Sequence, residues 1–393
     1  MGMTAKTHGL DGTLVEPAWP PLTLPEVRAL LREFPGCGEP IEIDSVSPRP
    51  FSAAGVINTQ REQVFIKRHH RLVRDREGLL EEHRFIAHLR EHGAPVPLVL
   101  PASNGETAIE AGDRTYEVHE APHAADLYAD AQSWTPFRSV QHAYSAGRAL
   151  AQLHCASQGY LAAARKPRPL VASFTIFASH NPESAMERYL AARPALARDE
   201  TTRKACREAL DLLAPFHAEL KSLLPALVPL WTHNDLHASN LLWSDSGIDA
   251  HAIAIIDLGL ADRTNAVHDL AHAVERNIVE WLALVENPSR PEAVPVHIDD
   301  LHALLAGYES VRPLSDGEAA ALAPMTALCH AEFALSEADY FLGVLRSKEQ
   351  AQMAVPNYLV DHARWFRSPS GDRLLDGIRA WADRQDRQKA EPG

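Results

Sequence analysis

The sequence predicts an α+β protein with two lobes: a small antiparallel β-sheet lobe that includes one helix, and a large, mainly helical lobe. Short apolar runs separated by turn residues fill residues 41–120 and are typical of β-hairpins. Apolar residues at helical spacing dominate residues 121–393. Two short apolar runs between residues 241 and 256 interrupt the helical part and predict an isolated hairpin there.

The composition is that of an ordinary globular protein and excludes several functional classes. Of the 393 residues, 46% are hydrophobic and 23% are charged. The net charge of −14, with no long Lys/Arg block, argues against a nucleic-acid partner. The four cysteines form no C-x-x-C pair, which argues against a disulfide scaffold and a cysteine zinc site. The sequence gives no indication of the oligomeric state.

The N-terminal residues lack the basic-then-apolar pattern of a signal peptide, and no apolar run is long enough to span a membrane. We therefore expect a cytoplasmic protein without a membrane partner.

Prolines at positions 17, 20 and 21 predict a loose arm over residues 1–22. Thr23 is placed to cap a helix that Gly36 and Gly38 end. Residues 1–40 are thus expected to form an arm and a helix, residues 41–120 the small lobe, and residues 121–393 the helical lobe.

Within the small lobe we expect strands over residues 41–46 and around 56–57 and 64–66, the last of them ending at Lys67. The basic stretch 67–77 is interpreted as a solvated connector, with contact to an acidic partner or to nucleotide phosphates as the alternative. An amphipathic helix follows and ends before Gly93, and a hairpin turns at Gly112-Asp113. In the large lobe, helical patterns cover residues 139–157, 183–196, 202–226, 268–286, 301–308, 319–345 and 371–382.

The segment from Trp231 to Asp257 contains the chemistry. It places Asp235, Asn240 and Asp257 in the order D-x4-N followed by an aspartate at a strand end. This arrangement suits phosphoryl transfer, in which one aspartate accepts the proton of the attacking hydroxyl while an amide oxygen and a second carboxylate hold Mg²⁺. A hairpin between Asn240 and Asp257 would make these two residues neighbours.

The pattern His233-Asn-Asp235-x4-Asn240, followed by Asp257-Leu-Gly259, resembles the H-x-D-x4-N and D-x-G elements of protein-kinase-like enzymes. It is most similar to the aminoglycoside phosphotransferase and choline kinase superfamily, and the looser resemblance extends over about residues 41–284. The resemblance implies a protein-kinase-like fold with a nucleotide-binding N-lobe. It also implies ATP and Mg²⁺ as cofactors and a small molecule whose hydroxyl group is phosphorylated.

The resemblance also implies roles for residues of the N-lobe. Lys67 would contact the α- and β-phosphates and be held by Glu82, with Glu81 as the alternative one residue away. The loop 51–55 lacks the G-x-G-x-x-G pattern, so Ser52 and backbone amides are expected to contact the phosphates. The carbonyl of His119 and the amide of Ala121 would bind adenine.

In the C-lobe, the resemblance makes Asp235 the catalytic residue and Asn240 and Asp257 the metal ligands. His233 and Asp269 would support the catalytic loop, and His154 is expected to be a packed, hydrogen-bonded core residue.

The acceptor pocket is expected from the helices after Pro122 and Asp269 and from the C-terminal third. The excess of acidic residues favours a cationic acceptor, and Glu275 or Glu280 is the candidate for binding an amine. His268 and His272 stand four residues apart, as in a zinc helix, but Asp269 is shorter than the glutamate of that motif. No third ligand is evident, so we do not expect a metal at this pair.

Two alternatives remain. The sequence around Glu82-His83 is similar to that of bacterial stress-response Ser/Thr protein kinases, but no activation segment separates Asp262 from the next helix. The missing glycine pattern favours a nucleotide-binding pseudokinase, although the other polar positions of the family are present. The acceptor itself, whether an aminoglycoside, an amino alcohol or a sugar-like molecule, is open at this stage.

Overall fold

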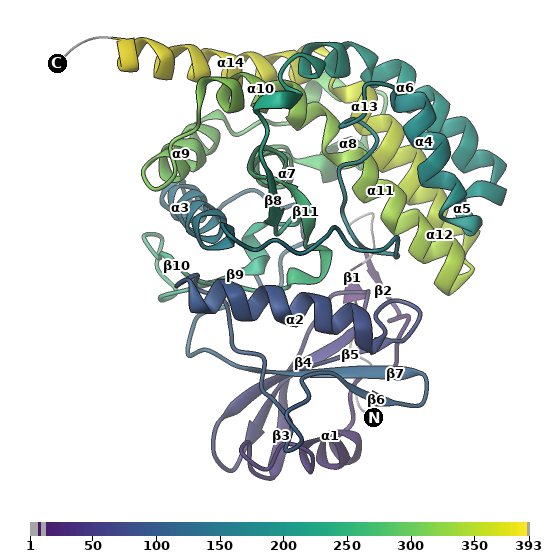
Figure 1. Ribbon diagram of the computed structural model, residues 1–393, viewed down its shortest axis with the longest axis vertical. Coiled ribbons are helices and arrows are strands. Elements are labelled where there is room, and N and C mark those ends of the chain that lie inside the picture. Colours follow the sequence, from purple (N-terminus) through teal and green to yellow (C-terminus); the bar gives the residue numbers. More distant parts are fainter. Residues whose placement is uncertain (1–6, 9–12, 391–393) are drawn as a thin grey trace.

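The small lobe is built on a five-stranded antiparallel sheet, and the large lobe consists mainly of helices (Figure 1). The computed structural model describes residues 7–8 and 13–390. The sheet has the strand order β3-β4-β5-β7-β6, with β3 (Pro40–Val46), β4 (Ala53–Thr59), β5 (Gln63–His70), β6 (Ile109–Ala111) and β7 (Arg114–Glu120). The predicted two-lobed α+β architecture is therefore confirmed.

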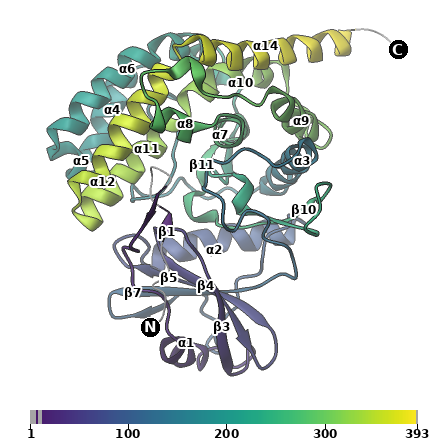
Figure 2. The same ribbon diagram turned by 180° about the vertical axis from the view of Figure 1, so that it is seen from behind.

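One helix packs on each face of this sheet. Helix α1 (Leu24–Leu31) begins where the Thr23 side chain accepts a hydrogen bond from the Glu26 amide, and its apolar residues join the sheet in a separate small core. Helix α2 (Arg76–Glu91) lies between the sheet and the large lobe in both views (Figures 1 and 2). The face of the sheet that carries Lys67 is thus turned toward α2 and the large lobe.

The described part of the N-terminal arm is fastened to the molecule, so the prediction of a loose arm is wrong there. Strand β1 (Thr7–His8) pairs with β2 (Leu14–Val15). The Trp19 ring stacks on His70 of the small lobe, and Trp19 Nε1 donates to the Tyr340 hydroxyl of the large lobe at 2.9 Å. Residues 1–6 and 9–12, which the signal-peptide argument concerned, lie outside the described residues.

The large lobe contains α3 (Val140–Ser157), α4 (Pro182–Ala191), α5 (Pro194–Arg198), α6 (Glu200–Lys221), α7 (Ala266–Ile278), α8 (Trp281–Glu286), α9 (Ile298–Glu309), α10 (Asp316–Leu328), α11 (His330–Asp339), α12 (Lys348–Gln352), α13 (His362–Trp365) and α14 (Pro369–Ala390). Two π-helical segments, Tyr340–Leu345 and Met353–Asp361, adjoin α11 and α12. Among the described helices, none combines the length and apolar character needed to cross a membrane. The cytoplasmic location stays a prediction from the sequence.

Two predicted helices are divided in the structure. The segment 268–286 forms α7 and α8, because the extended Val279 between them makes a β-bridge with Val296. The segment 319–345 falls into α10, α11 and the first π-helical segment. Apolar spacing does not reveal these breaks, because every part of both segments is buried against the same core.

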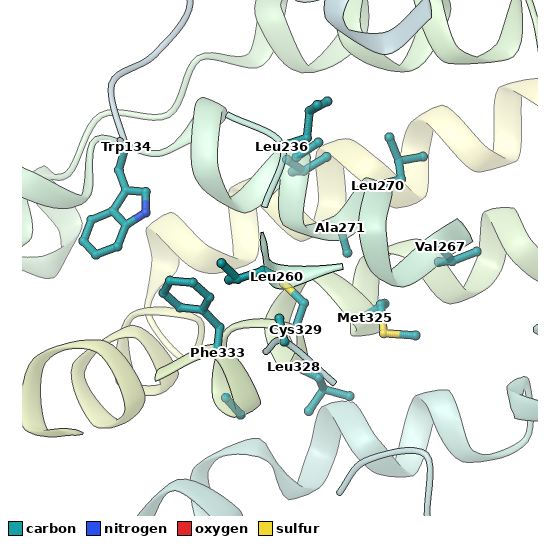
Figure 3. Close-up of a cluster of buried hydrophobic side chains, with 14 of the residues drawn as sticks. Trp134, Leu236, Leu260, Val267, Leu270, Ala271, Met325, Leu328, Cys329 and Phe333 are labelled. Carbon is teal, nitrogen blue, oxygen red and sulfur yellow. The ribbon is translucent and has the colours of Figure 1, made fainter. Parts of the chain in front are cut away.

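Two small two-stranded sheets hold the segment that was expected to carry the chemistry. Strand β9 (Leu241–Trp243) pairs with β10 (Ala252–Ile255), which confirms the predicted hairpin. Strand β8 (Pro229–Thr232) pairs with β11 (Asp262–Asn265), which we did not predict because its sequence, Asp-Arg-Thr-Asn, has no apolar alternation. Leu236 and Leu260, which follow these strand ends, point into the buried cluster formed with α7, α10 and α11 (Figure 3). This packing fixes both loops to the core of the large lobe.

Helices α3 and α9 approach each other through glycine. A Cβ atom at Gly147 would lie 2.0 Å from the Leu304 carbonyl oxygen, and one at Gly307 would lie 1.9 Å from that of Tyr144. No side chain fits at either position. The close approach places His154 Nδ1 on α3 at 2.7 Å from the Tyr308 hydroxyl on α9.

We therefore expect Gly147→Ala to lower the free energy of unfolding by about 1–3 kcal/mol, although alanine favours a helix, because the helices must separate. Urea unfolding measures this change. Gly36→Ala is the matched control, since a Cβ at Gly36 meets nothing within 4 Å. Equal stability of the two variants would contradict the close contact.

Candidate active site

A buried carboxylate, Asp269 at the start of α7, holds the loop of residues 233–240, which we call the catalytic loop. Asp269 Oδ2 accepts from the His233 amide at 2.8 Å, and Oδ1 accepts from the Asn234 amide at 2.7 Å. His154 Nε2 lies 2.9 Å from Oδ2. Burial raises the pKa of Asp269, but the contact with His154 outweighs it and keeps the group ionised. His154 is a packed, hydrogen-bonded core residue, as predicted.

His233 and Asn234 shape the loop from within. His233 Nε2 faces the Ile256 carbonyl oxygen at 2.9 Å, and its Nδ1 accepts from the Asp235 amide at 3.2 Å. These bonds are of the kind expected for a residue that supports the loop. Asn234 has a left-handed backbone with φ of 62°, a conformation that asparagine tolerates better than most residues. Its side-chain oxygen accepts from the hydroxyls of Thr232 and Thr264.

The hairpin β9–β10 brings Asn240 and Asp257 together beside Asp235. Asn240 Nδ2 donates to the Asp235 carbonyl oxygen at 2.9 Å, and the Ile256 amide donates to the Asn240 carbonyl oxygen at 3.0 Å. Because its nitrogen is engaged, the Asn240 side chain has its oxygen left for another partner. Asp257 also has a left-handed backbone, with φ of 58°. An amide oxygen and a carboxylate are the hard ligands that Mg²⁺ prefers, so this pair fits the ion.

Asp235 lies in a buried site with basic neighbours at moderate distances. Arg276 Nε is 3.4 Å from its Oδ1, and His237 Nε2 is 3.7 Å from its Oδ2. Burial raises the pKa of Asp235 to about 6, even though Arg276 opposes the shift. A carboxylate with this pKa is a better proton acceptor near neutral pH than an ordinary aspartate.

Lys67 contacts Asp257 across the boundary between the lobes, with Nζ 2.7 Å from Oδ1. Burial lowers the pKa of Lys67, but attraction to Asp257 and Glu117 outweighs burial and raises it above its ordinary value. The ammonium group therefore remains charged. The expected ion pair between Lys67 and Glu82 is not found among the ion pairs of the described residues.

Glu82 instead binds two arginines that the sequence did not single out. Its Oε1 accepts from Arg74 Nε at 2.6 Å and from Arg165 Nη2 at 2.8 Å. Both arginines also donate to the Gly259 carbonyl oxygen, at 2.5 and 3.1 Å. Glu81, the alternative, contacts Arg165 Nε at 3.3 Å. Helix α2 is thus fixed to the segment after Asp257 through guanidinium groups.

Sequence reasoning could not find this arrangement. Arg74 belongs to the basic stretch that was interpreted as a solvated connector, yet only 2% of Arg74 is exposed. Arg165 lies more than 80 residues from Glu82 along the chain, and no pattern links the two. Charge in a sequence does not show which guanidinium is buried.

The loop between β3 and β4, where Ser52 is half-buried, contacts the large lobe. Arg49 Nη1 donates to the Ala131 carbonyl oxygen and to Ser133 Oγ, both at 3.1 Å. The charges of Asp235 and Asp257 act on Arg49, which places its guanidinium near the catalytic carboxylates. Arg49 is a candidate phosphate contact that the sequence, with a single arginine between two prolines, did not reveal.

The predicted adenine contacts lie where β7 ends. His119 is opposite Phe65 in the sheet and forms a bridge with Val99 on its other side. The Ala121 amide donates to the Gln63 carbonyl oxygen at 3.4 Å, which is a long bond. Binding of adenine by these backbone groups stays a prediction.

On the acceptor side, both glutamates that were predicted to bind an amine have basic partners, and Glu275 Oε2 also lies 3.9 Å from the Nε atom of Arg276, which contacts Asp235. Glu275 faces His362 Nδ1 at 3.1 Å, and Glu280 faces His297 at 2.7 Å, with 39% of its side chain exposed. His268 and His272 pack ring against ring, with centroids 4.6 Å apart, next to Phe174 and Phe333.

Two further buried charged residues belong to this region: Arg276, which contacts Asp235, and Glu337, on which the charges of Arg276, Asp235 and Glu275 act. The Arg276 guanidinium lies 3.8 Å from the Phe333 ring centroid and 5.4 Å from that of Trp134, and Figure 3 shows these two rings at one end of the buried cluster. Within the described residues, Arg276 Nε and Nη2 and Glu337 Oε2 are buried without a hydrogen-bond partner. Burial raises the pKa of Glu337 to about 8. Unsatisfied buried polar groups beside a catalytic carboxylate indicate a binding site for a polar ligand.

Comparison with known proteins decides the family. A family model described as the phosphotransferase enzyme family matches residues 52–314, more than half of the chain. The chain belongs to the phosphotransferase enzyme family. This phosphotransferase is an enzyme that transfers phosphate to a hydroxyl group of a small molecule, which confirms the resemblance and the enzyme class inferred from the sequence. No curated protein matches the sequence.

Solved structures share the fold of this phosphotransferase over most of the chain. A microcompartment-associated aminopropanol kinase is 20% identical, with a TM-score of 0.57, and the match covers 90% of this chain and 100% of that one. A choline/ethanolamine kinase family protein from Mesorhizobium loti is 16% identical, with a TM-score of 0.52 and coverage of 91% and 100%. Amicoumacin kinase hAmiN, in complex with AMP-PNP, Ca²⁺ and Ami, is 14% identical, with a TM-score of 0.51 and coverage of 84% and 89%. At these identities the similarities establish the fold and not the substrate.

The contacts of Lys67 and Glu82 predict separate effects in the phosphotransferase. Glu82→Gln removes the negative charge that balances two buried arginines. We therefore expect the free energy of unfolding to fall by about 3–5 kcal/mol. Lys67→Ala should weaken ATP binding, leave adenosine binding unchanged and lower stability less. Chemical unfolding and calorimetry measure both effects. Glu77→Gln, at an exposed ion pair with Lys166, is the control. Equal loss of stability in Glu82→Gln and Glu77→Gln would contradict the role of Glu82.

Proposed function

We propose that this phosphotransferase uses MgATP to phosphorylate a hydroxyl group of a small molecule that carries an amine. The observation that supports the reaction is the convergence of Asp235, Asn240 and Asp257 at the ends of one loop and one hairpin, with Lys67 beside them. The family favours a small-molecule acceptor over the protein substrate of the stress-response alternative.

Asp235 is the proposed proton acceptor. Its backbone is held by His233 and, through the adjacent amides, by Asp269. Its carboxylate is buried and kept near Arg276, so it can bond to a hydroxyl group of the acceptor and take up the proton as the oxygen attacks the γ-phosphate. Since the transition state of phosphoryl transfer is loose, positioning supplies most of the catalysis.

The neighbouring residues are proposed to bind the nucleotide. Asn240 Oδ1 and the Asp257 carboxylate would hold Mg²⁺, which neutralises charge on the phosphate oxygens. Lys67 would contact the α- and β-phosphates. Ser52 and the amides of its loop would contact the phosphates, while His119 and Ala121 would bind adenine through their backbones.

Arg49 would approach the phosphates from the loop before β4, since the charges of Asp235 and Asp257 act on its guanidinium. It already spans the two lobes through Ala131 and Ser133. A guanidinium at this position would add positive charge opposite the phosphate oxygens, as a substitute for part of the missing glycine pattern.

The acceptor class follows from the unsatisfied groups beside Asp235. A cation is the partner that compensates Glu337, and an ammonium group supplies both the charge and the hydrogen bonds. Arg276 Nε already faces the Asp235 carboxylate, and Nη2, which is buried without a hydrogen-bond partner among the residues that the structure describes, calls for an acceptor oxygen such as that of a hydroxyl or carboxylate group. We therefore infer an amine-bearing acceptor with at least one oxygen function in addition to the hydroxyl that is phosphorylated.

The function is tested with Asp235→Asn and a panel of hydroxylated amines. We expect turnover to fall by roughly 10²- to 10⁴-fold with ATP affinity nearly unchanged, because the substitution removes only the proton acceptor. Asp245→Asn, in the exposed turn of the same hairpin, is the control. Near-normal turnover by Asp235→Asn would contradict its role. ATP binding without turnover of any acceptor would support the pseudokinase instead.

The same assignment predicts the pH dependence. The proton acceptor is active only when deprotonated, so kcat/KM should rise as the pH rises through about 6 and fall about tenfold per pH unit below it. Glu337→Gln should retain this limb, since Glu337 titrates higher. A flat profile between about pH 5 and 7 would contradict the proposed role of Asp235.

Glu337 is tested through the proton that its buried carboxyl group releases. With a pKa of about 8, Glu337 is largely protonated at neutral pH and should lose its proton when a cation binds beside it. Calorimetry in buffers of different ionisation enthalpy should therefore show proton release when an amine-bearing alcohol binds, and none in Glu337→Gln. That variant should also lose discrimination between the amine and the same alcohol without it. Glu280→Gln is the control, and an identical proton count in all three proteins would refute the amine site.

A further inference from the structure

Three histidines converge on one buried glutamate of the small lobe, which is paired with Lys67 across the β5–β7 ladder. His83 Nε2 and His119 Nε2 each lie 2.9 Å from Glu117 Oε2, and His69 Nε2 lies 2.9 Å from Oε1. The side chains of His69, His83 and Glu117 are at most 6% exposed. The proposed function uses the backbone of His119 and assigns no step to the four side chains of this cluster.

The backbone explains why these groups meet. Glu117 and His119 are two residues apart on β7, so both side chains leave the same face of the sheet. His69 is two residues beyond Lys67 on β5, and Lys67 is paired with Glu117 across the ladder, so His69 leaves that face too. His83 comes from α2, which covers the face and places the imidazole over the carboxylate.

The geometry points to a site for a divalent transition-metal ion, zinc, bound by His83 Nε2, His119 Nε2 and Glu117 Oε2. These three atoms all lie within 4.8 Å of one another. Ligand atoms of a tetrahedral zinc site with bonds of about 2.0–2.1 Å stand about 3.3 Å apart. The two Nε2–Oε2 distances of 2.9 Å are already close to this value, and the two Nε2 atoms, which are at most 4.8 Å apart, would move toward each other on binding. Two imidazoles and one carboxylate are a common ligand set for zinc, with water in the fourth position.

The neighbours of the three ligands are those of a metal site. His83 Nδ1 lies 2.8 Å from Thr107 Oγ1, a contact that fixes the ring while Nε2 faces Glu117. His69 holds the other oxygen of the carboxylate. Outer partners of this kind orient metal ligands and strengthen binding. The His119 side chain is 15% exposed, which provides an entry path for the ion.

A metal here would act on the position of α2. It would join β7 to His83, the residue that follows Glu82, and Glu82 holds the two arginines that bind the Gly259 carbonyl. The site would therefore stabilise the contact between the small lobe and the segment after Asp257. Its role is structural and is distinct from that of the Mg²⁺ ligands Asn240 and Asp257.

The test uses full-length protein that has been stripped of metal and titrated with Zn²⁺ in competition with a chelator. The background carries His88→Ala and His92→Ala, because these rings on α2 are 4.0 Å apart and form a second candidate zinc pair at the surface. We expect one zinc per chain, a rise in Tm on binding, and at least about tenfold weaker binding in His83→Gln. His69→Asn should weaken zinc binding less than His83→Gln, because His69 is not a proposed zinc ligand and contacts only the carboxylate of Glu117.

Spectroscopy on protein that keeps His83, Glu117 and His119 makes the test independent of whether the variants fold. The Co²⁺-loaded protein should show the intense absorption of a tetrahedral site, and X-ray absorption of the zinc-loaded protein should count two imidazole ligands. Any of three results would overturn the proposal: equal zinc affinity of His83→Gln and its parent, an octahedral cobalt spectrum, or a Tm that zinc does not change. The cluster would then be a hydrogen-bonded network of one carboxylate and three imidazoles.

Discussion

The active site depends on one buried carboxylate, that of Asp269. The carboxylate accepts hydrogen bonds from two successive backbone amides of the catalytic loop, and it also contacts His154. His154 in turn contacts the Tyr308 hydroxyl, where α3 and α9 approach each other closely at their glycines. A loop of this shape leaves its amides without partners inside the protein, and an unpaired buried amide is costly. The carboxylate removes that cost and fixes the direction in which Asp235 points. The backbone at Asp235, the proposed proton acceptor, is therefore held through Asp269 and His154 by the contact of α3 with α9.

Charged groups connect the two lobes in addition to the apolar contacts that α2 makes with the large lobe. Lys67 reaches Asp257, Arg49 reaches the segment 131–133, and Arg74 and Arg165 join α2 to the backbone after Asp257. The apolar residues form a separate cluster around α1 and the sheet and a much larger one in the rest of the molecule. Arginine suits the junction because its planar group can bind carboxylates and carbonyl oxygens at the same time. This construction keeps the carboxylates at the boundary ionised while the surrounding residues exclude water.

In the region proposed to bind the acceptor, by contrast, buried charged groups are left without hydrogen-bond partners in the described part of the chain. Arg276 and Glu337 are buried with hydrogen-bonding groups that have no partner there, and burial is the main cause that raises the pKa of Glu337 to about 8. Such groups lower the stability of the protein on their own and gain their partners from a ligand. The Phe333 ring, one turn before Glu337 on α11, covers the Arg276 guanidinium and keeps it in place. In the proposed function, specificity for a polar acceptor would have its physical origin in these polar groups, which have no hydrogen-bond partner within the described residues.

The sequence by itself determined the fold class, the family and the short-range geometry of the catalytic segment. Asp235, Asn240 and Asp257 are close along the chain or joined by one hairpin, and local rules of pairing are enough to bring them together. It did not determine which charged residues pair over long distances. Glu82 meets Arg74 and Arg165 instead of Lys67, and Arg276 and Glu337, which the sequence did not single out, are buried in the same region as Asp235 and Glu275. Only the tertiary structure decided these contacts, because burial and the distances between elements far apart in the chain select the partners of a charge, and neither is encoded in local spacing.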